Sequence, residues 1–348
     1  MRRDRHVLLF FMDGVGLGST DPETNPFVTA SMPHLTALLG EGWYLQGQPP
    51  RVTARASLAP TDATLGVPGL PQSATGQATI LTGRNVPRLV GEHYGPKPNP
   101  SVASVLEEGT LFAEVVQAGG RAALLTPYPE RYFEGVASGR RLLSAVPLAA
   151  RNAGLPLHTA DDLRNGDAVS PDFTNQGWRE HLGYGDMPLL SLQGAGRRIA
   201  VLTRRYQFSF FEHWPSDRHG HRGTLQEARA HLERIDAVLG GLFAGLIALA
   251  LWARRRRDHR LQYRPAGDRR RLSGWAGRAH LRAWRQADLR DHRRDPDAAH
   301  LPHRQRAGHR RLSGAISGHE FLHRDRRAVQ FAGGCGPTPG QVLRLVRH

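Results

Sequence analysis

The chain has 348 residues, 39% of them hydrophobic, which is enough for one large folded domain or two smaller ones. A single cysteine, Cys335, excludes an intrachain disulfide and favours a reducing compartment, so we expect a cytoplasmic protein. The formal net charge is +16, but residues 247–348 hold 24 arginines against 8 acidic residues, whereas residues 1–246 hold 23 basic and 23 acidic residues. Charge therefore divides the chain into a neutral segment, 1–246, and an Arg-rich tail, 247–348.

The first predicted element is a β-strand over residues 7–12, because six consecutive apolar residues are typical of a strand buried on both faces. This run is too short for a secretion signal and lacks a cleavage site. It leads directly into Asp13 and Gly14. A carboxylate that follows a buried parallel strand lies where open α/β sheets place their sites, so Asp13 is a candidate site residue. The alternative is a simple Asp-Gly turn.

The next informative stretch, residues 70–83, reads Leu-Pro-Gln-Ser-Ala-Thr-Gly-Gln-Ala-Thr-Ile-Leu-Thr-Gly and predicts a helix that begins at Ser73. A hydroxyl at a helix start lies beside unpaired backbone N–H groups and the positive end of the helix dipole, a suitable place for phosphate. The alternative is that Ser73 or Thr75 merely caps the helix. Thr75 also competes with Ser73 for the role of a nucleophile.

The remaining apolar patterns predict alternating helices and strands, which is typical of a doubly wound α/β sheet. Predicted helices span 32–39, 101–117, 138–152 and 223–246, and predicted strands span 121–126, 198–203 and 206–211, with short strands within 43–58. His93, in a loop rich in Gly and Pro, is either a solvated histidine or a phosphate contact.

Asp217 and His221 form a further candidate pair in the stretch Asp-Arg-His-Gly-His. Carboxylate and imidazole groups one helical turn apart could chelate one divalent ion, and both suit zinc or manganese. Solvated loop residues are the alternative.

These motifs, in this order along the chain, resemble the alkaline phosphatase superfamily, in particular its phosphopentomutase and cofactor-independent phosphoglycerate mutase branch. The resembling stretches are Asp13-Gly14-Val15-Gly16, Asn25-Pro26-Phe27, Met32-Pro33-His34-Leu35, 65–77 and 217–221. The resemblance implies an α/β fold over 1–246, with a mainly parallel sheet flanked by helices on both faces.

The same resemblance implies metal-dependent phosphoryl transfer on a small phosphorylated substrate, by a phosphomonoesterase or a phosphomutase. Ser73 would be the nucleophile, Asp13 and Ser73 would bind one of two divalent metal ions (Mn or Zn), and Asp217 and His221 would bind the second. The chain between Ser73 and Asp217 is mostly used by core elements, so we expect a reduced cap domain, which favours a phosphatase over a mutase.

The tail, 247–348, lacks a sustained helical or strand period. The apolar run 238–252 that precedes it is shorter than a membrane span, so no membrane anchor is expected. The tail is an irregular nucleic-acid-binding arm, a genuine domain or, as we prefer, a segment translated in a shifted frame. If the tail is genuine, the alternative function is a non-catalytic, cationic nucleic-acid-binding protein.

The resemblance implies that an apolar strand ending in Asp-His-Gly follows residue 246 and supplies further metal ligands. Asp258 and His259 stand there, but Arg260 replaces the glycine, and His319 has still less support. The chain as written is therefore expected to bind metal poorly and to be impaired as an enzyme.

Overall fold

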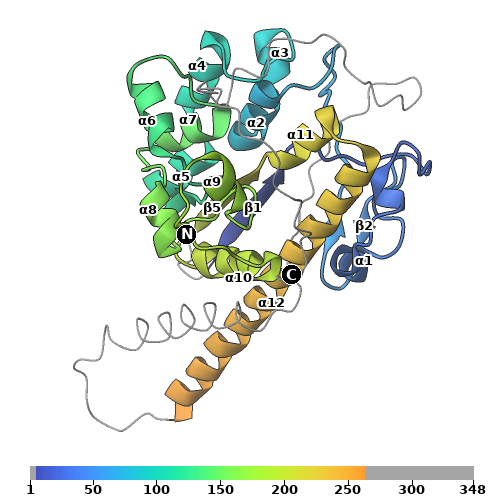
Figure 1. The fold of residues 1–348 in the computed structure, drawn as a ribbon, viewed down its shortest axis with the longest axis vertical. Coiled ribbons are helices and arrows are strands. Elements are labelled where there is room, and N and C mark those ends of the chain that lie inside the picture. Colours follow the sequence, from blue (N-terminus) through green and yellow to red (C-terminus); the bar gives the residue numbers. More distant parts are fainter. Residues whose placement is uncertain (1–4, 263–348) are drawn as a thin grey trace, which may run out of the picture. The chain divides into compact units, whose positions relative to one another are not determined.

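The computed structural model of the protein describes residues 5–262, with the backbone alone from residue 250 onward. Its centre is a three-stranded parallel sheet with the strand order β1-β5-β4 (Figure 1). The strands are β1 (Val7–Met12), β5 (Phe208–His213) and β4 (Ala122–Leu124). In the register of β1 and β5, Met12 lies opposite His213. The carboxyl ends of these two strands therefore meet at one edge of the sheet.

Helices cover both faces of this sheet, because consecutive strand residues point to opposite sides. On one face, Leu9, Phe11 and Phe210 pack in an apolar cluster with residues of five helices: α2 (Ser73–Thr82), α3 (Val86–Val90), α4 (Pro100–Glu108), α5 (Leu111–Gln117) and α7 (Ala145–Asn152). On the other face, Phe10 and Phe211 pack with α1 (Pro33–Leu39), α10 (Leu192–Thr203) and α12 (Leu225–Gln262). The predicted α/β class, the parallel sheet and the two covered faces are confirmed.

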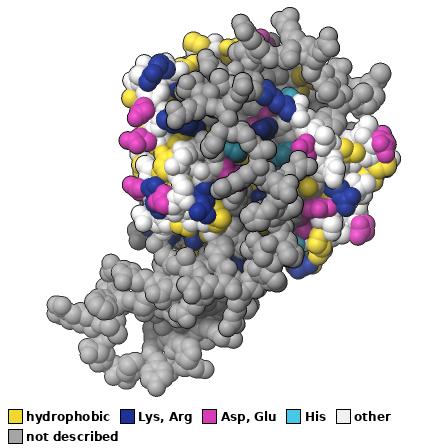
Figure 2. Space-filling model, in the orientation of Figure 1, with side chains coloured by type: hydrophobic (Ala, Val, Ile, Leu, Met, Phe, Trp, Pro, Cys, Tyr) yellow, Lys and Arg dark blue, Asp and Glu magenta, His cyan; other side chains and the backbone are white. Residues whose placement is uncertain are grey.

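The other elements are short and connect this core. They are the 3-10 helix η1 (Pro26–Val28), the antiparallel pair β2 (Arg51–Val52) and β3 (Ser57–Leu58), and the helices α6 (Glu130–Ala137), α8 (Ala160–Asn165), α9 (Gln176–His181) and α11 (Pro215–Arg222). On the face that Figure 2 shows, acidic, basic and hydrophobic side chains of the described residues are interspersed, as expected from the balanced charge of residues 1–246.

One predicted strand is wrong: residues 198–203 form the end of α10. A short apolar run does not distinguish a strand from a buried helix by itself. The helix is specified upstream, where the Ser191 side chain accepts a hydrogen bond from the Gly194 N–H at 3.0 Å and caps the first turn. Ile199 and Leu202, three positions apart, are then both buried on the same side of the helix.

The predicted helix 101–117 is two helices. Gly109 has a φ of 154°, which ends α4, and the side chain of Thr110 caps α5. The predicted helix 138–152 begins only at Ala145, because Ser138 ends α6 and Gly139 follows at a φ of 71°.

The helix predicted over 223–246 continues to Gln262 as α12, so residues 247–262 are helical. Asp258 and His259 lie on this helix and not after a strand. His319 and the rest of the predicted tail lie outside the described residues. No helix in the described part of the chain is long and apolar enough to cross a membrane.

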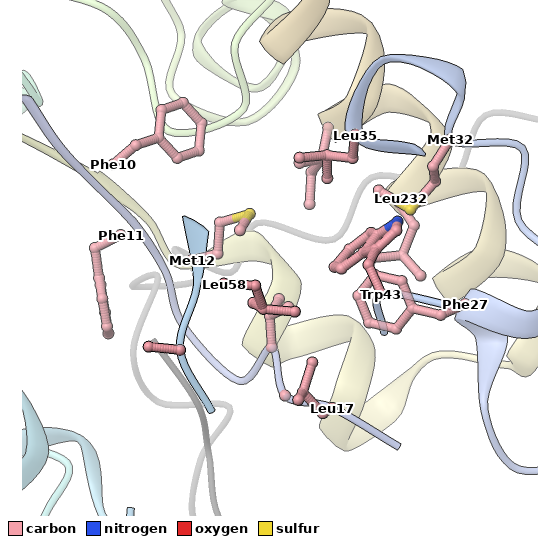
Figure 3. A pocket seen from close by; sticks show the side chains of 14 residues that line it. Phe10, Phe11, Met12, Leu17, Phe27, Met32, Leu35, Trp43, Leu58 and Leu232 are labelled. Atoms are coloured by element: carbon pink, nitrogen blue, oxygen red, sulfur yellow. The ribbon is translucent and has the colours of Figure 1, made fainter. Parts of the chain in front are cut away.

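A small apolar hollow of about 40 Å³ runs along β1 (Figure 3). Phe10, Phe11 and Met12 all line it, although neighbouring strand residues point to opposite faces. The hollow therefore follows the edge of β1 rather than one of its faces. Leu58 of β3 and the buried Trp43 also line it, and the indole Nε1 of Trp43 has no hydrogen-bond partner there.

Candidate active site

Asp13 is held at the carboxyl end of β1 by two hydrogen bonds to its backbone. Its N–H donates to His213 O at 3.0 Å, and the Ser216 hydroxyl donates to its carbonyl at 2.6 Å. Gly14 follows at a φ of +71°, and a Cβ built on it would lie 2.8 Å from Asp217 Cα. Only glycine allows this approach and this backbone conformation together. The glycine thereby brings the start of α11 against the end of β1 and places Asp217 beside Asp13.

Ser73 is the first residue of α2, and its hydroxyl faces Asp13. Ser73 Oγ donates to Asp13 Oδ2 over a long distance of 3.4 Å. The N-cap position of α2 is occupied by Gln72, which makes no side-chain capping bond. Ser73 is therefore not the cap of this helix, and its hydroxyl is directed toward a carboxylate at the positive end of the helix dipole.

Thr75 has a different environment, although it is only two residues away. Its side chain is fully buried, and its hydroxyl donates to Tyr94 O at 3.3 Å and accepts from Tyr94 N–H at 3.2 Å. The backbone N–H of Thr75 also donates to Tyr94 O. These bonds attach the loop that contains Tyr94 to α2, so the hydroxyl of Thr75 has a structural role.

Asp217 and His221 lie one turn apart on α11, with His221 Nε2 3.4 Å from Asp217 Oδ1. The His221 side chain is 76% exposed. Its hydrogen bond with Asp217 raises the pKa of the imidazole above its usual value and favours the cation. The structure thus brings the predicted residues together in two pairs, Asp13 with Ser73 and Asp217 with His221.

The carboxyl group of Asp13 is electrostatically perturbed. Burial is the main cause that raises its pKa to about 6, and the negative charge of Asp217 is the second. Hydrogen bonds from the Gly14 N–H and the Ser73 hydroxyl act in the opposite direction. A carboxylate with this pKa is mostly ionised at neutral pH and can still accept a proton readily.

Two functional candidates were missed in the sequence, namely Glu212 and Gln77. Glu212 lies in β5 and is 6% exposed, and burial together with the charge of Asp13 raises its pKa to about 8. The side-chain amide of Gln77 on α2 lies between the two acids, with Nε2 3.4 Å from Asp13 Oδ2 and 3.5 Å from Glu212 Oε1. A glutamate within the apolar strand Phe-Ser-Phe-Phe-Glu-His was the signal that could have revealed this cluster.

A pair of buried histidines lies behind the site. His213 Nδ1 donates to Pro171 O at 2.7 Å, and His213 Nε2 is 2.8 Å from His231 Nε2. Burial lowers the pKa of His213 far below its usual value and that of His231 to about 4. Both imidazoles are therefore neutral at pH 7 and join β5 to α12.

The donor set for metal ions is incomplete among the side chains that the structure describes, those of residues 5–249. No group of three or more His, Cys, Asp or Glu side chains among them is placed to hold a metal ion. Protein sites for zinc commonly use three or four protein ligands, whereas Asp13 with Ser73, and Asp217 with His221, supply two each. These residues alone do not fit two divalent ions.

Comparisons with known proteins do not identify a family for the chain. No family model matches it, and no curated protein matches it. A structure of the PH0037 protein from Pyrococcus horikoshii is similar over 70% of this chain and 76% of that one, with 15% identity and a TM-score of 0.40. At these values the likeness adds no argument to the geometry above.

Proposed function

We propose that the chain is a phosphoryl-transfer enzyme of the alkaline phosphatase type, a phosphomonoesterase or a phosphomutase, in which Ser73 accepts the phosphoryl group. The observation that supports this proposal is the position of Ser73 Oγ, 3.4 Å from Asp13 Oδ2 at the start of a ten-residue helix. The nucleophile Ser73 and the proton acceptor Asp13 are thereby adjacent at the N-terminus of α2, and a helix N-terminus favours the binding of anions.

In the proposed reaction, Ser73 Oγ attacks the phosphorus atom of a phosphomonoester, and Asp13 Oδ2 takes the hydroxyl proton. The new Oγ–P bond forms as the ester P–O bond breaks, and the leaving alkoxide takes a proton from water. Water then cleaves the phosphoserine and yields inorganic phosphate, or an alcohol group of the substrate takes the phosphoryl group back. The proton returns from Asp13 to Ser73 at this step.

The surroundings of Ser73 support the charge changes in this scheme. The pKa of about 6 suits Asp13 to accept a proton at neutral pH. The N–H groups at the start of α2, apart from that of Thr75, which donates to Tyr94 O, would stabilise the negative charge that develops on the phosphoryl oxygens. The cationic form of His221, which Asp217 favours, offsets part of the negative charge of the two carboxylates.

Two divalent ions remain part of this proposal through the resemblance alone, and no step above depends on them. Because each predicted pair supplies only two donors, we expect weak binding of Mn²⁺ or Zn²⁺. Titration calorimetry on the full chain measures it directly. Asp217→Asn removes one donor and should lower the affinity further, whereas Asp161→Asn, at a surface aspartate on α8, should not.

The test of the proposed function is the detection of phosphoserine at Ser73. The full chain is incubated with a labelled phosphomonoester, with and without Mn²⁺, and quenched with acid, and the modified peptide is located by mass spectrometry. We expect the label on Ser73 and its loss in Ser73→Ala, with retention in Thr82→Ala, which alters the far end of the same helix. Label on Thr75, or no label in either condition, would contradict the proposal.

The alternative function, nucleic-acid binding through 247–348, is supported by the excess of arginine in that segment. Most of the segment lies outside the described residues. A steep fall of DNA or RNA affinity with salt concentration would support this function, and loss of binding in a chain without the arginines would locate it.

A further inference from the structure

A hollow of about 420 Å³ lies beside the start of α2 and is open to solvent. Two loops form it, one that leads into α2 and one that follows α3. The residues that line it are Pro68, Gly69, Leu70, Gln72, Glu92, His93, Tyr94 and Gly95.

The hollow adjoins the proposed nucleophile. A Cβ built on Gly95 would lie 3.1 Å from the backbone nitrogen of Ser73 and 3.1 Å from Gln72 Cβ. The bonds between Thr75 and Tyr94 hold the second loop at this distance from α2. When the phosphate of a phosphomonoester lies against Ser73, the leaving group of the ester is therefore within reach of the hollow.

The residues that line the hollow include one acid, Glu92, and neither Lys nor Arg. The side chains of Gln72 and Tyr94 can both accept and donate hydrogen bonds. His93 Nε2 lies 3.2 Å from the carbonyl oxygen of Val67, which can only accept, so Nε2 donates in this hydrogen bond. The side chain of Leu70, 67% exposed, adds an apolar surface. The acid Glu92 and the apolar surface of Leu70 together favour a small leaving group that carries hydrogen-bond donors. They disfavour a leaving group that carries a negative charge of its own.

We propose that this hollow binds the leaving group and selects an alcohol that carries hydrogen-bond donors and no negative charge, with an amino alcohol as the best case. The inference rests on the proposed phosphoryl transfer and names its substrate class. Esters whose leaving group bears a carboxylate are then poor substrates, because that carboxylate would face Glu92.

The test compares two esters of similar size, phosphoethanolamine and phosphoglycolate, on the full chain. The single negative charge of Glu92 attracts the ammonium group of one ester and repels the carboxylate of the other. In water-like surroundings this difference should make kcat/KM for phosphoethanolamine on the order of tenfold higher than for phosphoglycolate. Glu92→Gln should bring the ratio close to one, and Glu92→Lys should invert it. Glu107→Lys is the matched control, since Glu107 is an exposed residue of α4 outside the hollow, and it should leave the ratio unchanged.

The outcomes separate this inference from the proposed function. Turnover with a ratio that does not respond to Glu92 would overturn the inference and leave the phosphoryl transfer intact. Absence of turnover and of phosphoserine at Ser73 would overturn the proposed function. Binding is then measured by calorimetry with Ser73→Ala and the same two esters, and equal affinities would overturn the inference as well.

Discussion

The buried carboxyl group of Glu212 leads to a prediction about stability. Glu212 is 6% exposed, and its pKa of about 8 in the folded chain compares with 4.5 for a free glutamate. Replacement by glutamine keeps the shape of the side chain and removes the titration. We therefore expect Glu212→Gln to raise the free energy of unfolding, by an amount that depends on pH.

The magnitude follows from the two pKa values. The folded chain retains the proton on Glu212 up to about pH 8, whereas the unfolded chain releases it above 4.5. In this window the folded state binds more protons, so the stability that the protonated group contributes is complete below the lower value, falls steadily between the two values and is fully lost above the upper one. At about 1.4 kcal/mol per pH unit, the cost relative to glutamine is near zero at pH 4.5, roughly 3 kcal/mol at pH 7 and roughly 5 kcal/mol at pH 9.

The assay is chemical denaturation at pH 5, 7 and 9, without added metal, followed by tryptophan fluorescence. Glu107→Gln, on the exposed side of α4, is the control and should change the unfolding free energy little at any pH. A gain from Glu212→Gln that does not grow between pH 5 and 9 would refute the reasoning. So would destabilisation at pH 9, since it would mean that the ionised carboxylate is stabilised by contacts that glutamine cannot make.

Three further predictions concern the same region. Ser73→Ala should leave the unfolding free energy nearly unchanged, whereas Thr75→Ala should lower it by about 1–3 kcal/mol, because it removes buried hydrogen bonds; denaturation of both variants tests this difference. Gly14→Ala should destabilise the chain by several kcal/mol, because its Cβ would lie 2.8 Å from Asp217 Cα at a φ of +71°, and a melting temperature close to that of the parent chain would contradict the described approach of α11 to β1. Stability should fall as the pH drops from 6.5 to about 4, because the unfolded chain binds a proton on His231 in that window and the folded chain does not; His231→Gln should flatten this fall by roughly 3 kcal/mol, and an unchanged acid profile would exclude His231 as its cause.

The sequence predicts well those parts of the fold that local patterns determine. The apolar run 7–12 and the helix start at Ser73 lie where the patterns place them, because an uninterrupted apolar strand and a Pro turn before a helix are signals within a few residues. Asp13 lies at the carboxyl end of the parallel strand β1, where the sequence predicts a site residue. Ser73 reaches it from α2 and Asp217 lies beside it on α11, and the sequence did not predict these approaches from the strand pattern.

The predictions from sequence fail where residues far apart in the chain determine the local structure or the environment of a side chain. Residues 198–203 have a strand-like composition, yet the cap at Ser191 and the burial of one helical side against the sheet make them helical. The cluster around Glu212 was missed because its environment is formed by Gln77 and Asp13, which are far away in the sequence. Burial and the neighbouring charge, which give Glu212 its high pKa, exist only once the chain has folded.

The hollow along β1 has a consequence for the behaviour of the protein in solution. Within residues 5–262, β1 pairs only with β5, and the hollow follows its other edge. Val7 at the start of that strand is 53% exposed. The buried side chains of Trp43 and Leu58 form the far wall of the hollow, so the exposed end of the strand at Val7 is the part that another polypeptide strand can reach. Self-association at high concentration is therefore expected to begin at Val7, and a charged residue in its place should reduce it.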